Sequence, residues 1–317
     1  MGFGYMLSRV ADTIYWMARY VERTSGMLQV LRTTYISSQD VIKDFSWRPL
    51  LNTYAPELTT EELKEVEWDT TKVFEHLILG RENISSAYNN IRQARENARA
   101  IQDHIPKEVW QTLNNYYHFI RNHEFENQVR TGDPVTAIDV LIRNGLLFTG
   151  TIKNTMTRDE GYTYLHIGKF LERSIISADV LRIKLSVMYS ELKQAEEARN
   201  LRYLLYSLFG YELYMKTYKG NFNTQHVLEL IVYNPFFPHS ILYGLNQVNR
   251  YFERLQPESL PESYAQLEFL IGKTKNNVKY SALPADQSNI LNQFLLQTRA
   301  DLIAIGSSFS KYYFGNT

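Results

Sequence analysis

The sequence contains no cysteine. This absence excludes disulfide bonds, cysteine nucleophiles, thiolate zinc sites and cysteine-bound iron–sulfur clusters, and it fits a reducing compartment. A secretory signal is not expected either, because charged residues interrupt the apolar N-terminal stretch before it reaches sufficient length. These residues are Arg9, Asp12, Arg19 and Glu22. The sequence therefore predicts a cytoplasmic protein.

The chain also lacks an excess of charge of either sign. Thirty-four Lys and Arg residues balance thirty-four Asp and Glu residues, so the net charge is zero. A neutral chain has no long-range field that would gather nucleic acid or an anionic membrane surface. No stretch approaches the run of roughly 18 apolar residues that a membrane span needs. We therefore expect neither a nucleic-acid partner nor a membrane.

Several motifs of catalysis and cofactor binding are missing. The sequence has no phosphate-binding Gly-x-x-x-x-Gly-Lys or Gly-x-Gly-x-x-Gly and no Gly-x-Ser-x-Gly nucleophile turn. None of its seven histidines belongs to a Glu-x-x-His pair, and His118 and His123 have a poor spacing for metal ligands. The sequence predicts no metal and no cofactor.

Proline and glycine are few, with nine and fifteen residues in 317. Apolar residues instead recur at intervals of three and four, which predicts helices almost throughout. Thr59 is expected to cap a helix, and the segment Glu126–Gly132 is expected to be a loop. The predicted helices are Arg9–Ser38, Thr71–Leu79, Asn83–His104, Pro106–Phe125, Asp133–Met156, Arg158–Leu192, Asn200–Tyr218, Gln225–Tyr233, Pro238–Leu255, Glu262–Tyr280 and Asp286–Tyr313. The predicted fold class is all-α.

One stretch occurs twice. Residues 15–32, YWMARYVERTSGMLQVLR, match residues 165–182, LHIGKFLERSIISADVLR, with five of eighteen positions identical. At an offset of 154, Ser86 also aligns with Ser240. These matches predict a helical bundle built from two divergent repeats, residues 1–155 and 156–317, around two long central helices. The amphipathic pattern favours one merged domain, residues 1–317.

The repeated helix carries a Glu-Arg pair in each copy, Glu22-Arg23 and Glu172-Arg173. Adjacent residues on a helix point about 100° apart, so each group is expected to find its partner on another helix. The small residues Ala18 and Gly168, one turn earlier, would let a second helix approach. We predict that the two helices cross, with Glu22 meeting Arg173 and Glu172 meeting Arg23. Such a polar centre is either a structural lock or a site for a ligand or for catalysis.

A second candidate site lies in the segment IRQARENARAI. Arg92, Arg95 and Arg99 share one helical face and form a candidate anion site. The alternative is a solvated face whose arginines pair with their own Glu96. Ser240 is a further anion-binding candidate because it begins a helix, where free amides bind anions; ordinary capping is the alternative.

Four ordered segments carry a resemblance to a known family. They are MLSRVADTIYWMARYVER, IRQARENARAI with KEVWQTLN, TMTRDEGYTYLHIGKFLERS, and FPHS. Together they resemble the alpha-E family of bacterial helical proteins, which is named for its Glu-Arg motif. His239 in FPHS replaces an arginine of the family pattern, which weakens the case for an anion site there.

The resemblance implies an association with circularly permuted ATP-grasp proteins and transglutaminase-like proteins, and so amide-bond or peptide-like metabolite chemistry. Three functions remain open. The chain is expected to be an accessory or substrate-presenting partner of an ATP-grasp-type ligase, an enzyme of the same pathway that uses the Glu-Arg centre, or an architectural scaffold. The sequence is compatible with a homo-oligomer.

Overall fold

The computed structural model describes residues 6–40, 45–188, 194–256, 261–284 and 287–315. These residues form helices and connecting turns, with no β-strand among them, so the predicted all-α class is confirmed. The chain divides into two compact units: unit 1 contains residues 1–15 and 158–317, and unit 2 contains residues 16–157. Helix α1 (Ser8–Ser38) begins in unit 1 and continues in unit 2.

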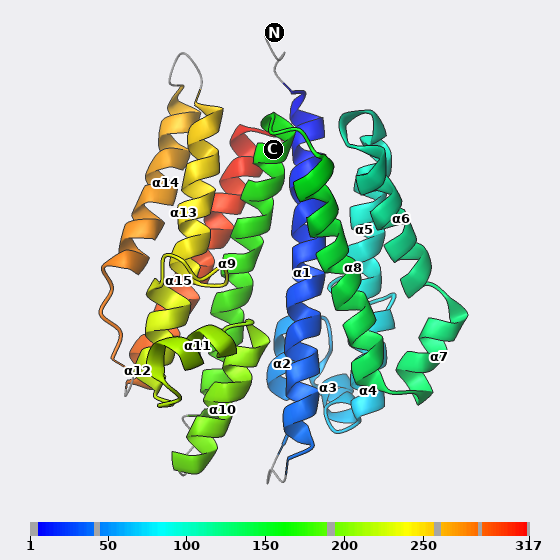
Figure 1. Cartoon of the computed structure of the whole chain (residues 1–317), viewed down its shortest axis with the longest axis vertical. Coiled ribbons are helices and arrows are strands. Elements are labelled where there is room, and N and C mark those ends of the chain that lie inside the picture. The colour runs from blue at the N-terminus through cyan, green and yellow to red at the C-terminus, as the bar shows by residue number, and fades with distance from the viewer. Residues whose placement is uncertain (1–5, 41–44, 189–193, 257–260, 285–286, 316–317) are drawn as a thin grey trace. The chain divides into compact units, whose positions relative to one another are not determined.

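In unit 2, helices α5, α6 and α8 lie side by side, and α7 packs against α4 and α8 (Figure 1). Fully buried aromatic side chains fill the core of this unit, among them Trp47, Phe74 and Tyr116. After α1 its elements are α2 Arg48–Tyr54, α3 Thr60–Val66, α4 Thr70–Phe74, the π-helical turn η1 Glu75–Leu79, α5 Ala87–Ala100, the 3-10 turn η2 Gln102–His104, α6 Lys107–Ile120, α7 His123–Thr131 and α8 Pro134–Thr155.

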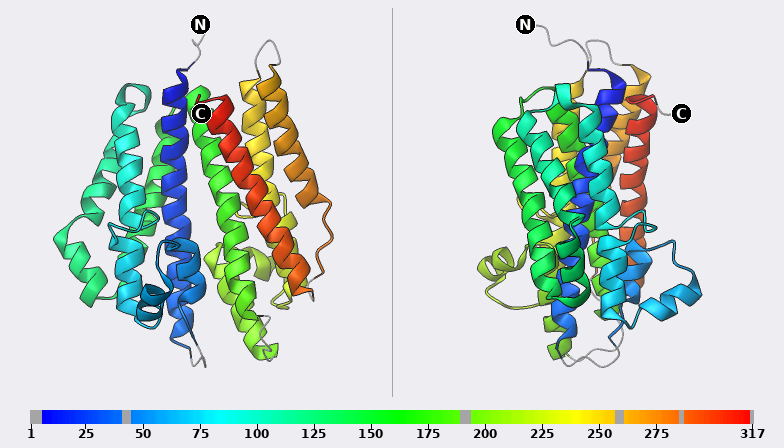
Figure 2. Two further views of the ribbon diagram at one scale, coloured as in Figure 1. Left: turned by 180° about the vertical axis from the view of Figure 1, so that it is seen from behind. Right: turned by 90° about the vertical axis from the view of Figure 1, so that its right-hand side faces the viewer.

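In unit 1, helix α9 packs against α13 and α15, and α14 packs against the same two helices on their other side, an arrangement that Figure 2 shows from behind. The elements of this unit are α9 Glu160–Met188, α10 Gln194–Ser207, α11 Tyr211–Tyr218, α12 Thr224–Leu228, the π-helical turn η3 Glu229–Tyr233, α13 Ile241–Phe252, the 3-10 turn η4 Glu253–Leu255, α14 Glu262–Lys279 and α15 Ser288–Tyr312.

Two predicted helix starts are confirmed by their caps. The Thr59 hydroxyl accepts a hydrogen bond from the Glu62 amide, and the Glu62 carboxylate accepts one from the Thr59 amide, which forms a capping box. The Asp133 carboxylate accepts hydrogen bonds from the amides of Val135 and Thr136, with Pro134 in the first turn. These local signals fixed the starts of α3 and α8.

The predicted loop Glu126–Gly132 is wrong, because this segment lies largely in helix α7. Asn122 caps the helix by accepting a hydrogen bond from the amide of Glu124 at 2.8 Å. Phe125 and Val129 lie one turn apart and are both buried, so the helix has a short apolar stripe. The preceding helix ends at Ile120 rather than at Phe125.

The predicted helix Asn200–Tyr218 is interrupted. Helix α10 ends at Ser207 and α11 begins at Tyr211. Between them Phe209 has a φ of 56°, a left-handed conformation that breaks the helical hydrogen-bond ladder. The remaining predicted boundaries of unit 1 lie close to the observed ones, although residues 189–193 and Asp286 fall outside the described part of the chain.

A change from α-helix to π-helix occurs in each unit. Helix α4 continues into η1 at Glu75, and α12 continues into η3 at Glu229, 154 residues later. At the end of η1, a Cβ atom on Gly80 would lie 2.3 Å from the carbonyl oxygen of His76, so only glycine fits there. Isolated π-helical turns are rare and frequently occur at functional sites.

Helix α8 is the one described helix that is long and apolar enough to cross a membrane. Buried helices of globular proteins can have the same length and apolar composition. Its buried side chains Ile138, Leu141 and Phe148 belong to the core of unit 2.

Candidate functional site

In both Glu-Arg helices, the arginine of the motif lies over an aromatic ring of the same helix. In unit 2 the Arg23 guanidinium lies 5.8 Å from the ring of Tyr20, three residues earlier on α1. In unit 1 the Arg173 guanidinium lies 5.7 Å from the ring of Phe170, again three residues earlier, on α9. Each arginine of the motif therefore makes a cation–π contact within its own helix.

The acidic partners of the motif, Glu22 and Glu172, are both buried. A buried carboxylate is costly unless it is hydrogen-bonded or paired. The predicted pairing of Glu22 with Arg173 and of Glu172 with Arg23 joins residues of different units, and it stays a prediction.

Close approach at Gly168 is confirmed. A Cβ atom on this residue would lie 2.5 Å from the backbone oxygen of Tyr15, so the first turns of α1 pack directly on α9. The Tyr15 ring lies 5.9 Å from the ring of Phe309 and 5.3 Å from that of Phe314. A small residue one turn before Glu172 thus lets a second helix approach, as its position predicts.

Two of the three candidate arginines of α5, Arg95 and Arg99, pair with a glutamate of the same helix. The Arg95 Nη1 atom lies 2.5 Å from Glu96, and the Arg99 Nη2 atom lies 2.6 Å from the other oxygen of the same carboxylate. Arg95 also donates to Asn114 at 3.0 Å and lies between the rings of Trp110 and Tyr117 of α6. Arg92 is exposed. Glu96 therefore already neutralises part of the candidate anion site.

Arg95 and Glu96 show that two adjacent residues of one helix can form an ion pair with each other. These residues are neighbours on one helix, yet their side chains form an ion pair at 2.5 Å. A long arginine side chain can therefore curl back to the next residue. The 100° separation of neighbours does not by itself send Glu22 and Arg23 to different partners.

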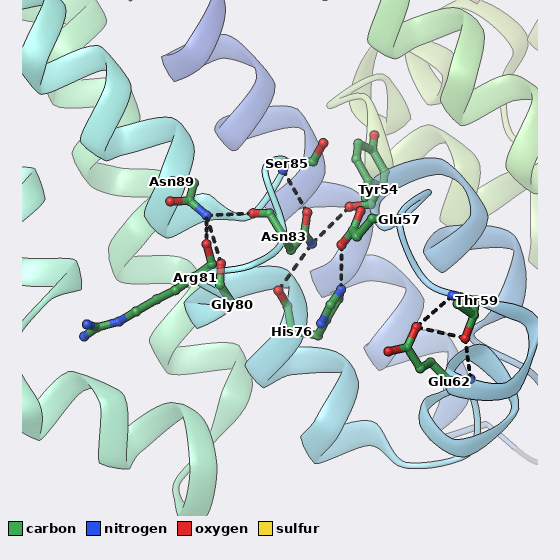
Figure 3. A network of polar contacts seen from close by, with 10 residues as sticks. All are labelled: Tyr54, Glu57, Thr59, Glu62, His76, Gly80, Arg81, Asn83, Ser85 and Asn89. Carbon is green, nitrogen blue, oxygen red and sulfur yellow. Dashed lines mark hydrogen bonds and ion pairs between the residues drawn. The ribbon is translucent and has the colours of Figure 1, made fainter.

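Ser240 and Asn83 serve the local backbone. The Ser240 hydroxyl accepts from the amide of Tyr243 at 2.9 Å and donates to the carbonyl of Asn234, so it caps α13. The cap of α5 is Ser86, and the predicted start at Asn83 is wrong. Figure 3 shows that Asn83 instead links two earlier elements, because its amide group donates to the carbonyls of Tyr54 at the end of α2 and of His76 in η1.

Helix α9 also buries a histidine and an aspartate. The His166 ring stacks on that of Tyr162 at 3.9 Å, and burial together with the nearby Lys169 charge lowers the pKa of His166 to about 3. Asp179 lies 2.8 Å from the Arg299 guanidinium, yet burial raises the pKa of this carboxyl group above its usual value. Burial thus shifts the pKa of each group in the direction that favours its neutral form.

A cavity lies in unit 1, between the π-helical turn η3 and helices α13 and α14. It has a volume of about 830 Å³, within the size range of small-molecule sites. Its lining combines polar and charged side chains with a few apolar ones. The lining residues are Gln225, Glu229, Tyr233, Pro235, Leu242, Asn246, Lys275, Asn276, Lys279, Ser281, Ala282 and Leu283.

Two hydrogen bonds organise the rim of this cavity. The Tyr218 hydroxyl donates to Glu229 at 3.2 Å, and burial together with the Glu229 charge raises the pKa of Tyr218 to about 12. The Tyr233 hydroxyl lies 3.0 Å from the Ser281 hydroxyl. Both phenols are therefore neutral near pH 7 and can orient the groups beside them.

None of these cavity residues was a candidate from the sequence alone. A signal was present, since Glu229 follows Glu75 by 154 residues and the connection after α14 is shorter than the one after α6. With residues 126–132 predicted as a loop, the two predicted connections have similar lengths.

The fold and the two Glu-Arg helices define a class of all-helical proteins. The sequence matches the Alpha-E family, which is described as a predicted α-helical domain with a conserved ER motif. The match covers residues 6–314. The chain belongs to this family.

Similar proteins include an uncharacterized protein of Mycobacterium bovis and one of Mycobacterium tuberculosis strain H37Rv. Each is 22% identical over 258 residues, which cover 76% of this chain and 29% of the relative. The chain thus spans less than a third of the length of these relatives. No solved structure matches it.

Proposed function

We propose that this Alpha-E chain is an accessory partner that presents a substrate to an ATP-grasp-type ligase during amide-bond or peptide-like metabolite formation. The observation that carries the proposal is the cavity of about 830 Å³ in unit 1, whose lining offers ammonium, carboxylate and amide groups. Such groups can hold an amino-acid-like substrate without a nucleotide site in the same chain. A cytoplasmic location, where ATP is available, belongs to the same proposal.

The length of the relatives supports a partner role. The matched region covers only 29% of each, so there the domain is one part of a larger protein. A module that works beside other domains in one protein can work beside a separate partner in another. The partner is an ATP-grasp-type or a transglutaminase-like protein.

We also propose that the chain arose by internal duplication. The α-to-π transitions at Glu75 and Glu229 and the serine caps Ser86 and Ser240 are each separated by 154 residues. Unit 2 ends at Thr157, two residues after the end of the first predicted repeat. These equal spacings support two copies of one helical unit.

An enzyme of the same pathway is the second candidate. Glu22 and Glu172 would then act in acid–base chemistry, with nearby arginines binding a carboxylate, and this candidate requires that they converge on an open pocket with perturbed ionisation. A purely architectural scaffold would use the same groups as structural pairs.

The test is co-expression with an ATP-grasp-type protein of the same organism, followed by purification of the complex. ATP turnover is then measured over amino-acid mixtures with and without the chain. We expect a stable complex and a change in turnover or in substrate preference. No complex and unchanged turnover would contradict the partner role.

The variants Glu22→Gln and Glu172→Gln separate the candidates. An enzyme loses activity at an unchanged melting temperature, whereas a structural pair loses stability, by about 3–5 kcal/mol when one partner of a buried pair is removed. A presenting module keeps complex formation as long as it stays folded.

A further inference from the structure

Under the proposed duplication, the cavity of unit 1 corresponds to a region that a helix covers in unit 2. In unit 2 the face formed by α4 and η1 is covered by α7, and Arg130 of α7 lies 3.0 Å from Glu75 of η1. Phe125 and Val129 of α7 are buried in the same region. In unit 1 the equivalent turn η3 faces the cavity, with Glu229 in the position of Glu75.

The difference comes from the chain between two core helices. Thirteen residues connect α6 to α8 and include α7, whereas eight residues connect α14 to α15. Helix α14 has 18 residues against 14 in α6, which makes it about one turn longer. Its last turns carry Lys275, Asn276 and Lys279, which line the cavity.

The charged groups of the cavity are unpaired with one another. Within the described ranges, Lys275 and Lys279 form no ion pair with a carboxylate, and Glu229 forms none with a cation. The lysines are four residues apart on α14, so they share one face of the helix. Unit 2 neutralises the corresponding Glu75 with its own Arg130. Among the described residues of unit 1, no cation pairs with Glu229 in this way.

We propose that this cavity binds a short peptide in its zwitterionic form. The C-terminal carboxylate lies at Lys275 and Lys279, and the ammonium group lies at Glu229, which Tyr218 orients. The amides of Gln225, Asn246 and Asn276 are available to the peptide bonds. This inference rests on the proposed function for its place in metabolism and specifies the class of substrate presented.

The proposed ligand follows from charge and size. Two ammonium groups bind a carboxylate through charge-assisted hydrogen bonds, and a carboxylate does the same for an ammonium group. A volume of about 830 Å³ is at the upper end of small-molecule sites, which leaves room for more than one amino-acid residue. Leu242 and Leu283 are buried at the wall and can contact small side chains.

The experiment is calorimetric titration of the full chain with tri-L-alanine, its C-terminal amide and its N-acetyl derivative. We expect saturable binding of one tri-L-alanine, weakened about tenfold or more by the C-terminal amide and by the Lys275→Met/Lys279→Met double variant. Lys273→Met is the matched control, since Lys273 is exposed on α14 but outside the cavity lining, and it should leave the affinity unchanged.

A second set of variants tests whether Glu229 binds the N-terminal ammonium group of the peptide. Glu229→Gln should weaken binding of tri-L-alanine about threefold to tenfold and leave the affinity of the N-acetyl derivative unchanged, because that ligand has no ammonium group. Glu268→Gln, an exposed change on α14, is the control. Circular dichroism melting confirms that each variant is folded.

Three results would overturn the assignment: no saturable binding up to millimolar peptide, binding that the cavity variants do not change, or inorganic phosphate that binds more tightly and displaces the peptide. The titration uses this chain alone. A failure here therefore leaves complex formation with the ligase intact, and a failed co-purification leaves peptide binding intact.

Discussion

The two π-helical turns have opposite surroundings. Around η1 in unit 2, helix α7 supplies two buried apolar side chains and the cation Arg130, which pairs with Glu75. Around η3 in unit 1 there is a cavity, and Glu229 accepts a hydrogen bond only from the neutral hydroxyl of Tyr218 among the described residues. The π-helical turn is thus covered by a helix in unit 2 and faces a cavity in unit 1.

The difference shows that a short helix can determine whether one face of a helical unit is buried or lines a cavity. A nine-residue helix between two long helices is enough to cover one face. In unit 1, helix α14 is four residues longer than α6 of unit 2, and its last turns present lysines to the cavity. Uncompensated charges around a cavity are costly to a core but useful for a ligand.

The largest expected effect on stability comes from truncating a buried side chain of α7, the helix that packs on α4 and η1 in unit 2. Phe125→Ala should lower the free energy of unfolding by about 3–5 kcal/mol, since it deletes a buried ring that lies 4.9 Å from the ring of Phe119. Urea denaturation measures it. Phe236→Ala, at a side chain that is 84% exposed, should change stability by less than about 0.5 kcal/mol. Equal effects would mean that α7 is not part of the core.

The second test concerns the packing of α1 on α9 in unit 1. Gly168→Ala should destabilise by about 1–3 kcal/mol, because the new methyl group meets the Tyr15 carbonyl at 2.5 Å. Gly272→Ala in α14, where no atom lies within 4 Å, should instead stabilise by up to about 1 kcal/mol. Thermal denaturation of both variants distinguishes the signs, and a stable Gly168→Ala protein would refute the close contact.

Acid should weaken unit 1 through His166. Its pKa is lowered to about 3 in the folded chain, so the unfolded chain binds the proton first, near pH 6.5. This contribution to stability is complete above pH 6.5 and falls as the pH drops toward 3. The loss between pH 7 and pH 5.5 is about 1 kcal/mol.

His166→Phe should reduce this acid-dependent loss, as measured by urea midpoints at the two pH values. In unit 2 the residue 150 positions earlier is Trp16, so Trp16→Phe removes no titrating group and should leave the pH dependence unchanged. An unaltered profile in His166→Phe would assign the acid sensitivity to other groups.

The smallest expected effect on the free energy of unfolding comes from replacing the glutamates of the two π-helical turns. Glu75→Gln removes an ion pair whose side chains are 39% and 48% exposed, and should cost less than about 0.5 kcal/mol. Glu229→Gln breaks no ion pair and should cost still less. A double-mutant cycle with Arg130→Met measures the coupling of Glu75, and zero coupling would remove the electrostatic part of the contrast between the units.

Much of the fold could be predicted from local signals in the sequence. The spacing of apolar residues predicted the long helix that runs from Ser8 to Ser38, and the pair Asp133-Pro134 predicted the start of α8. Such signals act over one or two helical turns and depend little on distant packing. The all-α class follows from their sum.

The parts that escaped prediction depend on contacts between elements. Helix α7 has only nine residues, so Phe125 and Val129 give too little periodicity to distinguish it from a loop. A π-helical turn differs from an α-helical one in backbone hydrogen bonds and not in composition. The cavity of unit 1 is lined by side chains from η3, α13, α14 and the segment after α14, which are far apart in the sequence and form no local motif.

The candidate site was predicted in part. The burial of Glu22 and Glu172 follows from their place beside the apolar stripe, and the close contact at Gly168 follows from its size. The pairing of Arg95 and Arg99 with Glu96 was one of two alternatives that the sequence left open. Lys275, Lys279 and Glu229 come together only through tertiary structure.

Helix α1 has a consequence for how this chain is made. Its first turns pack against Gly168 and the rings of Phe309 and Phe314, and the amide of Met6 donates to Glu160 at 2.8 Å. During translation residues 6–15 therefore leave the ribosome long before their partners in α15 are synthesised. Unit 2 can complete its own helices cotranslationally, whereas unit 1 can close only when the end of this sequence has emerged.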